Sequence, residues 1–277
     1  MTEKQTTNMK DIAFINVVLY PTDKQRSEEY IRLLSSILAD RVTIRTQSSD
    51  RSTLLRTFDK HSTYYHGYFC NAIFLTGDSK TLDVKSNTLQ ASVGDPNKGL
   101  EAKDMEFWYY PRYHRFAVYK PHLRMIVKFL RGAFLYKLGG KEYFAINIEK
   151  SKHTIDRIIQ AETLVSVSVS VRYANNDNIE DWEDLDNSLR ESNTEQASLQ
   201  MKSRKNSPIR VAKNKILKAF LILSKSYGTA KAQILNSDGK IENVNTRDHP
   251  NTIRVDVNSH VAENIGNYVS DIAQNKK

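Results

Sequence analysis

The sequence predicts an α+β fold of mixed, mainly antiparallel sheets with packed helices. Three observations predict it. Segments with strand spacing and segments with helix spacing both occur along the whole chain, they follow one another without regular strand–helix–strand alternation, and several strand pairs are separated only by short turns. We expect two domains in the 277 residues: an N-terminal α+β domain, 1–150, and a C-terminal α+β domain with a basic helix, 151–277.

The spacing of apolar residues predicts the helices and strands of the N-terminal part. A nearly continuous apolar run over 11–20 predicts a buried strand, and apolar residues three and four apart over 23–39 predict a helix. The strand over 64–75 is expected to pair with 81–93 in a hairpin around Gly77-Asp78. The other strands expected in this part are 41–46, 105–110, 113–120 and 142–148.

Turn and cap residues mark the helix that follows Pro121. Proline suits the first turn of a helix, the spacing of 122–138 is helical, and Gly139-Gly140 ends it. Ser151 suits the N-cap of a further helix over 152–161.

The C-terminal part contains the clearest strand pattern in the chain, the strict alternation of Ser and Val over 164–171. Pro208 is expected to begin a long helix that runs to about Lys225, and Asn236-Ser-Asp-Gly239 is a hairpin turn by composition. The other elements expected here are an acidic helix over 179–191, a strand around Gln200, strands at 228–235, 240–244 and 252–257, and a last helix after Ser259.

Composition excludes several classes of protein. The single cysteine, Cys70, excludes a disulfide framework and a zinc site with several cysteines. No apolar run reaches the roughly 18 residues of a membrane span, and the polar N-terminus lacks the apolar core of a secretory signal. We therefore expect a cytoplasmic protein that does not associate with membranes.

Positive charge is concentrated in two places. Lys and Arg total 41 against 32 Asp and Glu, which favours a polyanionic partner. Arg124, Lys128 and Arg131 share one face of the helix after Pro121, and the stretch 202–231 holds nine basic residues and no acid. Ordinary solvated helix faces would give the same pattern. The alternative is a phosphate-binding surface. Its candidate contacts are Arg124, Lys128, Arg131, Lys202, Arg204, Lys205, Arg210, Lys215 and Lys218.

Catalytic motifs are weak. The chain has no zinc-binding His pattern, nucleophile elbow, Walker loop or dinucleotide fingerprint. Asp78, Asp83 and Lys85 have the acid, acid and lysine order of metal-dependent nucleases, in which carboxylates hold Mg²⁺. Such strings also arise by chance in a charged chain, so we expect neither a catalytic site nor a cofactor, with Mg²⁺ required only if the nuclease alternative holds.

Several short segments resemble an uncharacterised bacterial family, a domain of unknown function found among candidate phage-defence genes. They are Phe107–Arg115, Ile146–Ile155, Val169–Asn176, Ser226–Ala232 and Asn245–Pro250, together with Asn16 and Tyr20-Pro21 in the first strand. The two-part layout is also distantly similar to that of the phage-exclusion protein Rex A. The resemblance implies a role in bacterial antiviral defence and supplies no catalytic motif.

These observations together predict a nucleic-acid-binding protein of an anti-phage defence system, with DNA favoured over RNA. Its basic helices would contact the phosphate backbone, with little sequence preference. The alternatives are a metal-dependent nuclease effector and a protein-interaction subunit of a defence complex. We also expect a homo-oligomer and a second defence protein as partners.

Overall fold

The computed structural model describes residues 8–20, 26–45, 51–74, 80–83, 88–91, 99–172, 183–192, 194, 196–204, 207–236 and 238–274. Its helices and antiparallel sheets confirm the α+β class. Among these residues, no helix is both long enough and apolar enough to cross a membrane.

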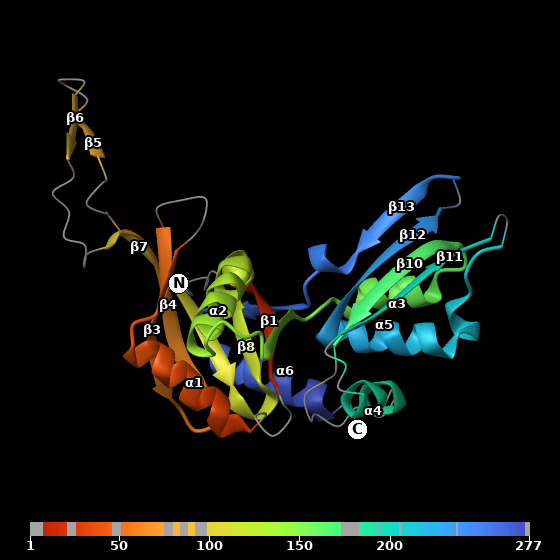
Figure 1. The fold of residues 1–277 in the computed structure, drawn as a ribbon, viewed down its shortest axis with the longest axis horizontal. Helices are drawn as coiled ribbons and strands as arrows, with labels where there is room; N and C mark the ends of the chain where they lie inside the picture. Colours follow the sequence, from red (N-terminus) through yellow and green to blue (C-terminus); the bar gives the residue numbers. More distant parts are fainter. Residues whose placement is uncertain are drawn as a thin grey trace, which may run out of the picture.

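The larger sheet has eight strands, which Figure 1 shows on the left. Seven follow the order β14-β1-β8-β7-β4-β3-β2, and β9 pairs with β1 beyond this path. The bounds are Met9–Leu19 (β1), Thr43–Arg45 (β2), Arg51–Lys60 (β3), Tyr65–Phe74 (β4), Gly99–Tyr110 (β7), Arg115–Tyr119 (β8), Phe144–Ile148 (β9) and Thr252–Asp256 (β14).

Strand β1 organises this sheet. Its residues from Ile12 to Leu19 are all buried, as the apolar run of the sequence predicts. One edge of β1 pairs with β14 over Met9–Ala13 and then with β9 over Ile15–Leu19, while β8 pairs along the opposite edge. Strands from distant parts of the chain therefore meet end to end along a single edge.

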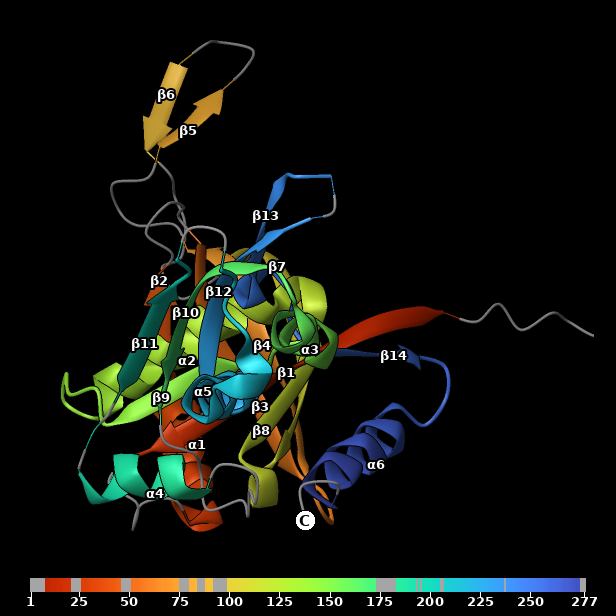
Figure 2. The same ribbon diagram turned by 90° about the vertical axis from the view of Figure 1, so that its right-hand side faces the viewer.

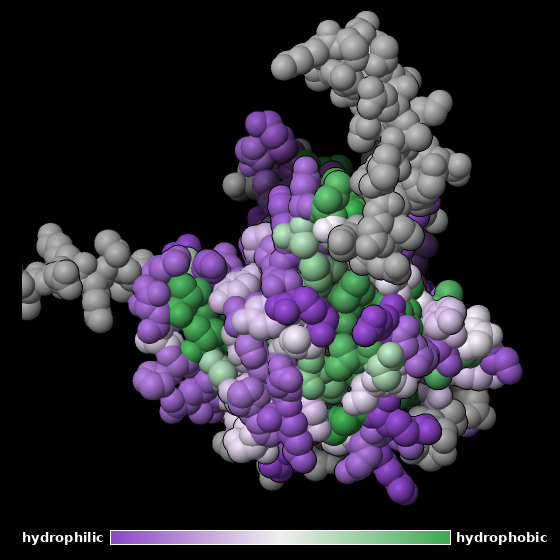
Figure 3. Space-filling view, turned by 90° about the vertical axis from the view of Figure 1, so that its left-hand side faces the viewer, coloured by the Kyte–Doolittle hydropathy of each residue, from purple (hydrophilic) through white to green (hydrophobic). Residues whose placement is uncertain are grey.

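Helices cover both faces of the larger sheet. Helices α1 (Ser27–Ala39) and α2 (Leu123–Lys137) pack on one face, through residues such as Leu34 and Phe129. Helix α6 (Val261–Gln274) packs on the opposite face, where Ile265 and Val269 are buried, and Figure 2 shows it across the sheet from α1. Seen from the β3 side, the surface has a band of apolar residues between hydrophilic ones (Figure 3).

The smaller sheet has the order β11-β10-β12-β13 and lies on the right of Figure 1. In β10 the valines at 167, 169 and 171 are buried, which confirms the alternation seen in the sequence. Helices α3 and α5 pack on this sheet, and the same core includes Val18 and Ala145 of the larger sheet. The bounds are Lys152–Gln160 (α3), Leu164–Val171 (β10), Glu183–Glu191 (α4), Ala197–Lys202 (β11), Lys215–Tyr227 (α5), Gly228–Leu235 (β12) and Ile241–Asn245 (β13).

The structure corrects the pairing expected for the strand at 64–75. This strand, β4, pairs with β3 and β7, so the expected partner 81–93 was wrong. Strands β5 (Lys80–Asp83) and β6 (Thr88–Ala91) instead pair with each other in a separate two-stranded sheet. The turn expected at Gly77-Asp78 lies outside the described residues, and strand β3 was not predicted.

The helix expected from Pro208 begins later. Residues 207–210 are not helical, and the backbone N–H of Ile209 donates to the carbonyl of Leu164 over 2.9 Å. A single 3-10 turn at Val211–Lys213 precedes helix α5, whose N-cap is Asn214. The Asn214 side chain accepts a hydrogen bond from the N–H of Leu217 over 2.9 Å, which fixes the start of the helix.

Candidate functional site

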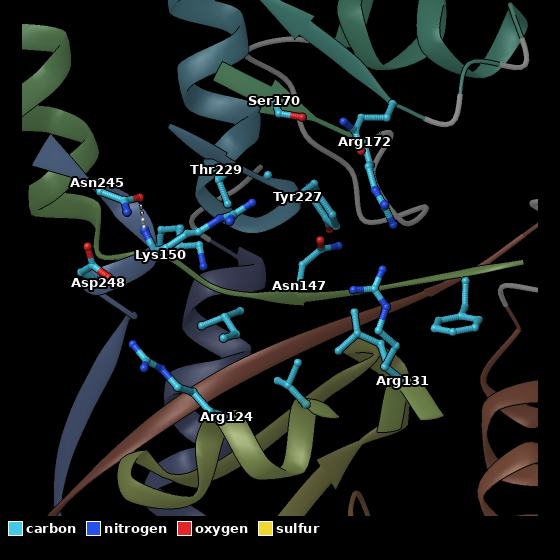
Figure 4. A pocket seen from close by; sticks show the side chains of 17 residues that line it. Arg124, Arg131, Asn147, Lys150, Ser170, Arg172, Tyr227, Thr229, Asn245 and Asp248 are labelled. Atoms are coloured by element: carbon cyan, nitrogen blue, oxygen red, sulfur yellow. Dashed lines mark hydrogen bonds between the residues drawn. The ribbon is translucent and has the colours of Figure 1, made fainter. Parts of the chain in front are cut away.

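A cleft of about 470 Å³ opens where the two sheets meet. Helix α2 and strand β9 of the larger sheet form one side of it, and the ends of β10, β12 and β13 form the other. Figure 4 shows basic and amide side chains from both sides directed into this space.

Helix α2 supplies two arginines because its polar face points to solvent. Ile126, Phe129 and Leu130 are buried against the sheet, while Arg124 and Arg131 are exposed and line the cleft. The two arginines lie seven residues apart, which is two helical turns and therefore the same face.

Strand β9 supplies the floor of the cleft. Val127 of α2, with Ile146 and Ile148 of β9, forms a half-buried apolar strip in the lining. Asn147 lies between the two isoleucines and also lines the cleft. Its Nδ2 atom is buried, and no residue in the described part of the chain accepts a hydrogen bond from it. An unmet buried donor costs free energy, so an acceptor entering the cleft beside Asn147 is favoured.

The smaller sheet supplies hydroxyls and another arginine. Ser170 and Arg172 lie at the end of β10, and Thr229 lies at the start of the neighbouring β12. Gly228 lets these strands approach, since a Cβ atom at this position would come within 2.1 Å of the Ser170 carbonyl oxygen.

A 3-10 turn, η6 (Thr246–Asp248), places Arg247 in the cleft. Thr246 is fully buried, and its Oγ1 accepts a hydrogen bond from Ala230 N–H over 2.9 Å. The Asn245 side chain accepts from the N–H of Arg247 over 3.1 Å and so caps the turn. Arg247 itself is exposed at the cleft.

Lys150 is the most deeply placed cation of the cleft, with a relative exposure of 6%. Its backbone N–H donates to the carbonyl of Lys225 over 2.7 Å, and Figure 4 shows Lys150 on the same side of the cleft as Asn245 and Asp248. Burial is the main cause that lowers its pKa to about 8, with a further contribution from Arg247, while Asp248 acts in the opposite direction.

A buried ion pair holds the segment that carries Lys150. Nε of Arg115 lies 2.5 Å from Oε1 of Glu149, and both side chains are almost completely buried. The N–H of Glu149 donates to the Phe14 carbonyl over 3.0 Å, and its carbonyl accepts from the N–H of Asn251 over 2.8 Å. Glu149 is thus fixed by three other segments of the chain, which positions the next residue.

The cleft carries a large excess of positive charge. Among the described residues, its lining contains Arg124, Arg131, Lys150, Arg172 and Arg247, against the single carboxylate of Asp248. Glu142, outside the lining, lies 3.7 Å from Arg131, and both side chains are more than half exposed. Guanidinium and ammonium groups donate several strong hydrogen bonds to phosphate oxygens. The arrangement therefore suits an anion that bears phosphate groups.

Two of the three basic residues predicted on α2 line this cleft. Arg124 and Arg131 do so, whereas Lys128 is exposed on the helix outside the lining. No carboxylate within the described ranges forms an ion pair with Arg124 or Lys128.

The second predicted cluster lies elsewhere. Lys202 pairs with Ser166, whereas the cleft begins at Ser170. Because Ser170 lies four positions beyond Ser166 on an extended strand, Lys202 is roughly 13 Å along the sheet from the start of the cleft. All five members that the structure describes are exposed: Lys202, Arg204, Arg210, Lys215 and Lys218. Lys205 lies outside the described residues.

Sequence reasoning missed three of the five cations, Lys150, Arg172 and Arg247. None of them belongs to a long run of basic residues or to a basic helix face, so the charge patterns that identified the other cations do not mark them. One signal was available: apart from the α2 residues, Phe144 and Gln196, every lining residue lies in the segments 146–155, 169–176, 226–232 and 245–250. These are four of the segments on which the family resemblance rests.

The residues of the nuclease alternative are mostly not described. Asp78 and Lys85 lie outside the described residues, and Asp83 is the last residue of β5. In the part of the chain that the structure covers, no group of three or more His, Cys, Asp or Glu side chains is placed to hold a metal ion.

Comparison with protein families gives one match. The family described as "Domain of unknown function (DUF4747)" matches residues 10–272, which include both sheets and every residue of the cleft. Among curated proteins the comparison finds no match.

Proposed function

The chain belongs to the DUF4747 family, and from its cleft we propose that it binds nucleic acid through phosphate groups. The observation that carries this proposal is the convergence of five cations, from four separate segments, on one cleft whose described lining has a single carboxylate. Like charges brought together in a folded protein repel one another, so this placement favours an anionic ligand.

Other features of the cleft fit the same ligand. Asn147, Ser170 and Thr229 offer amide and hydroxyl donors beside the cations, and such groups commonly contact phosphate and sugar oxygens. These contacts would position a strand rather than read its bases. The exposed cluster that includes Lys202 and Lys218 lies outside the cleft and would add only secondary contacts to the backbone.

We further propose that this binding serves bacterial defence against phage in the cytoplasm, without enzymatic activity of the chain itself. The support is the resemblance of the cleft-forming segments to a family found among candidate phage-defence genes. A second defence protein would then supply the effector activity.

The test measures binding of fluorescent DNA and RNA strands by anisotropy between 50 and 200 mM salt, roughly the range over which phosphate contacts weaken strongly. Arg124→Ala/Arg131→Ala removes two charges from the cleft. The matched control, Lys202→Ala/Arg204→Ala, removes two exposed charges from the distant cluster.

We expect the cleft variant to bind more weakly, with a logarithmic salt slope reduced by about 1.4–1.8 because two phosphate contacts are lost. The control should keep most of the affinity. If the control loses more affinity than the cleft variant, the main binding site is the cluster around Lys202. If the wild-type protein binds neither polymer at low salt, the proposal is wrong.

A further inference from the structure

The charge of the cleft exceeds what one internal nucleotide of a bound strand requires. A volume of about 470 Å³ lies within the range of pockets, roughly 300–1,000 Å³, that enclose a single small ligand. One nucleotide has this size. Within a strand, however, each nucleotide brings only one negative charge, whereas the described residues that line this volume include five cations and one carboxylate.

We infer that the cleft receives a nucleoside that bears two or three linked phosphates. This ligand class concentrates several negative charges in the volume of one nucleotide and so matches the lining. It has two sources, a free nucleoside di- or triphosphate and the 5′-triphosphate end of an RNA strand. The inference rests on the proposed function, because it places phosphate groups in the same cleft.

The interior of the cleft has the features of a built site. Lys150 lines the cleft and is more than nine-tenths buried, and Figure 4 shows it on the same side of the cleft as Asn245 and Asp248. Arg247, from η6, lies close enough to influence Lys150 electrostatically. Two cations placed together suit the terminal phosphates, which carry the most charge.

The other side of the cleft suits the nucleoside. Asn147 and Arg131 project into the same region (Figure 4). The Asn147 Nδ2 atom is a buried donor that no described residue satisfies, and a phosphate or sugar oxygen would accept its hydrogen bond. Val127, Ile146 and Ile148 provide a half-buried apolar strip on which the flat face of a base can pack.

The test compares three RNA strands of one sequence that carry a 5′-triphosphate, a 5′-monophosphate or a 5′-hydroxyl, each labelled at the 3′ end. We expect the triphosphate strand to bind at least about tenfold more tightly than the hydroxyl strand, since strong charge-assisted hydrogen bonds are added. Unlabelled ATP and GTP serve as competitors, and calorimetry measures their direct binding.

Both sources give a distinct positive result. Triphosphate-dependent strand binding that nucleotides do not displace identifies the RNA end as the ligand. Displacement by ATP or GTP at the concentration at which they bind alone identifies the free nucleotide.

Variants of cleft residues show whether the triphosphate or nucleotide binds in the cleft. Lys150→Gln, and the exposed Arg247→Gln, should abolish the preference for the triphosphate, whereas Lys152→Gln, an exposed neighbour outside the lining, should preserve it. Melting curves would verify folding of each variant.

Equal affinity for all three strands, with no nucleotide binding, would overturn this inference and leave the proposed function standing. A protein that binds neither strands nor nucleotides would refute both.

Discussion

Replacing Lys150 with methionine should stabilise the protein while it weakens ligand binding. Lys150 is buried in a cleft with four arginines, and among the lining residues that the structure describes only Asp248 offsets its charge. Methionine has a similar length and no charge, so it removes the electrostatic cost and keeps the packing. The backbone hydrogen bond from Lys150 to Lys225 does not depend on the side chain.

The size of the effect follows from the pKa of Lys150, which falls from 10.5 to about 8. Since one pKa unit corresponds to about 1.4 kcal/mol, the charged side chain lowers the free energy of unfolding by about 3 kcal/mol. This cost is present in full below pH 8, where the folded and unfolded states both carry the proton. It disappears as the pH rises from 8 to 10.5, because the folded state releases its proton first.

Urea unfolding, followed by circular dichroism from pH 6.5 to 9.5, measures this difference. We expect Lys150→Met to exceed the wild type by up to about 3 kcal/mol at pH 7, and the advantage to shrink by roughly 1.4 kcal/mol per pH unit above 8. Lys152→Met, at an exposed position, is the control and should change stability little at any pH. A Lys150→Met protein that is less stable than the wild type at pH 7, or whose advantage does not vary with pH, would refute the reasoning.

Three further substitutions test the framework around the cleft by the same unfolding measurement. Glu149→Gln leaves the buried Arg115 without its carboxylate and should cost about 3 kcal/mol; a loss below about 1 kcal/mol would show that the pair does not hold this segment. Asn214→Ala removes the N-cap of α5 and should cost about 1 kcal/mol, and an unchanged stability would contradict the observed helix start. Gly67→Ala places a Cβ atom 2.1 Å from the Thr57 carbonyl oxygen and should destabilise the larger sheet by more than about 2 kcal/mol, whereas a neutral effect would mean that β3 and β4 separate easily.

The local sequence pattern was sufficient to predict a helix or strand where one face of that element is buried. The alternation in 164–171 predicted β10, and the helical spacing after Pro121 predicted α2, because burial of one face imposes the period on the sequence. Strand β3, Arg51–Lys60, has charged residues at both ends and only a partial alternation. It is a strand because β2 and β4 pair with its two edges, and such pairing leaves no local signal.

The helix start predicted at Pro208 was wrong. Pro208 has the sequence context of a first helical residue, but the next residue, Ile209, forms a bridge with Leu164 of β10. Tertiary pairing thus keeps the chain extended there, and Asn214 supplies the cap that starts the helix. Within α5, Leu217 and Leu221 are buried, whereas Ile216 is 65% exposed.

The cleft was only partly predictable for the same physical reason. Arg124 and Arg131 share a helix face, so their spacing reveals them. Lys150 and Arg247 are almost a hundred residues apart in the chain, and only tertiary pairing brings them together. Runs of basic residues identified the cluster around Lys202. They cannot indicate cations that come singly from separate segments and meet only in the folded chain.

The topology of β1 explains why these cations gather where they do. Strands β9 and β14 follow each other along one edge of β1, so the chain leaves for the smaller sheet and returns from it at the same point. There Lys150 forms a bridge with Pro250, and the N–H of Ser151 donates to the carbonyl of His249 over 2.9 Å. The departing and returning segments therefore carry Lys150 and Arg247 to the junction between the sheets.

An anion bound at this junction would contact α2, both crossing segments and β10 together. The charge that destabilises the free protein would then favour the complex, in which the phosphates offset the repulsion between the cations.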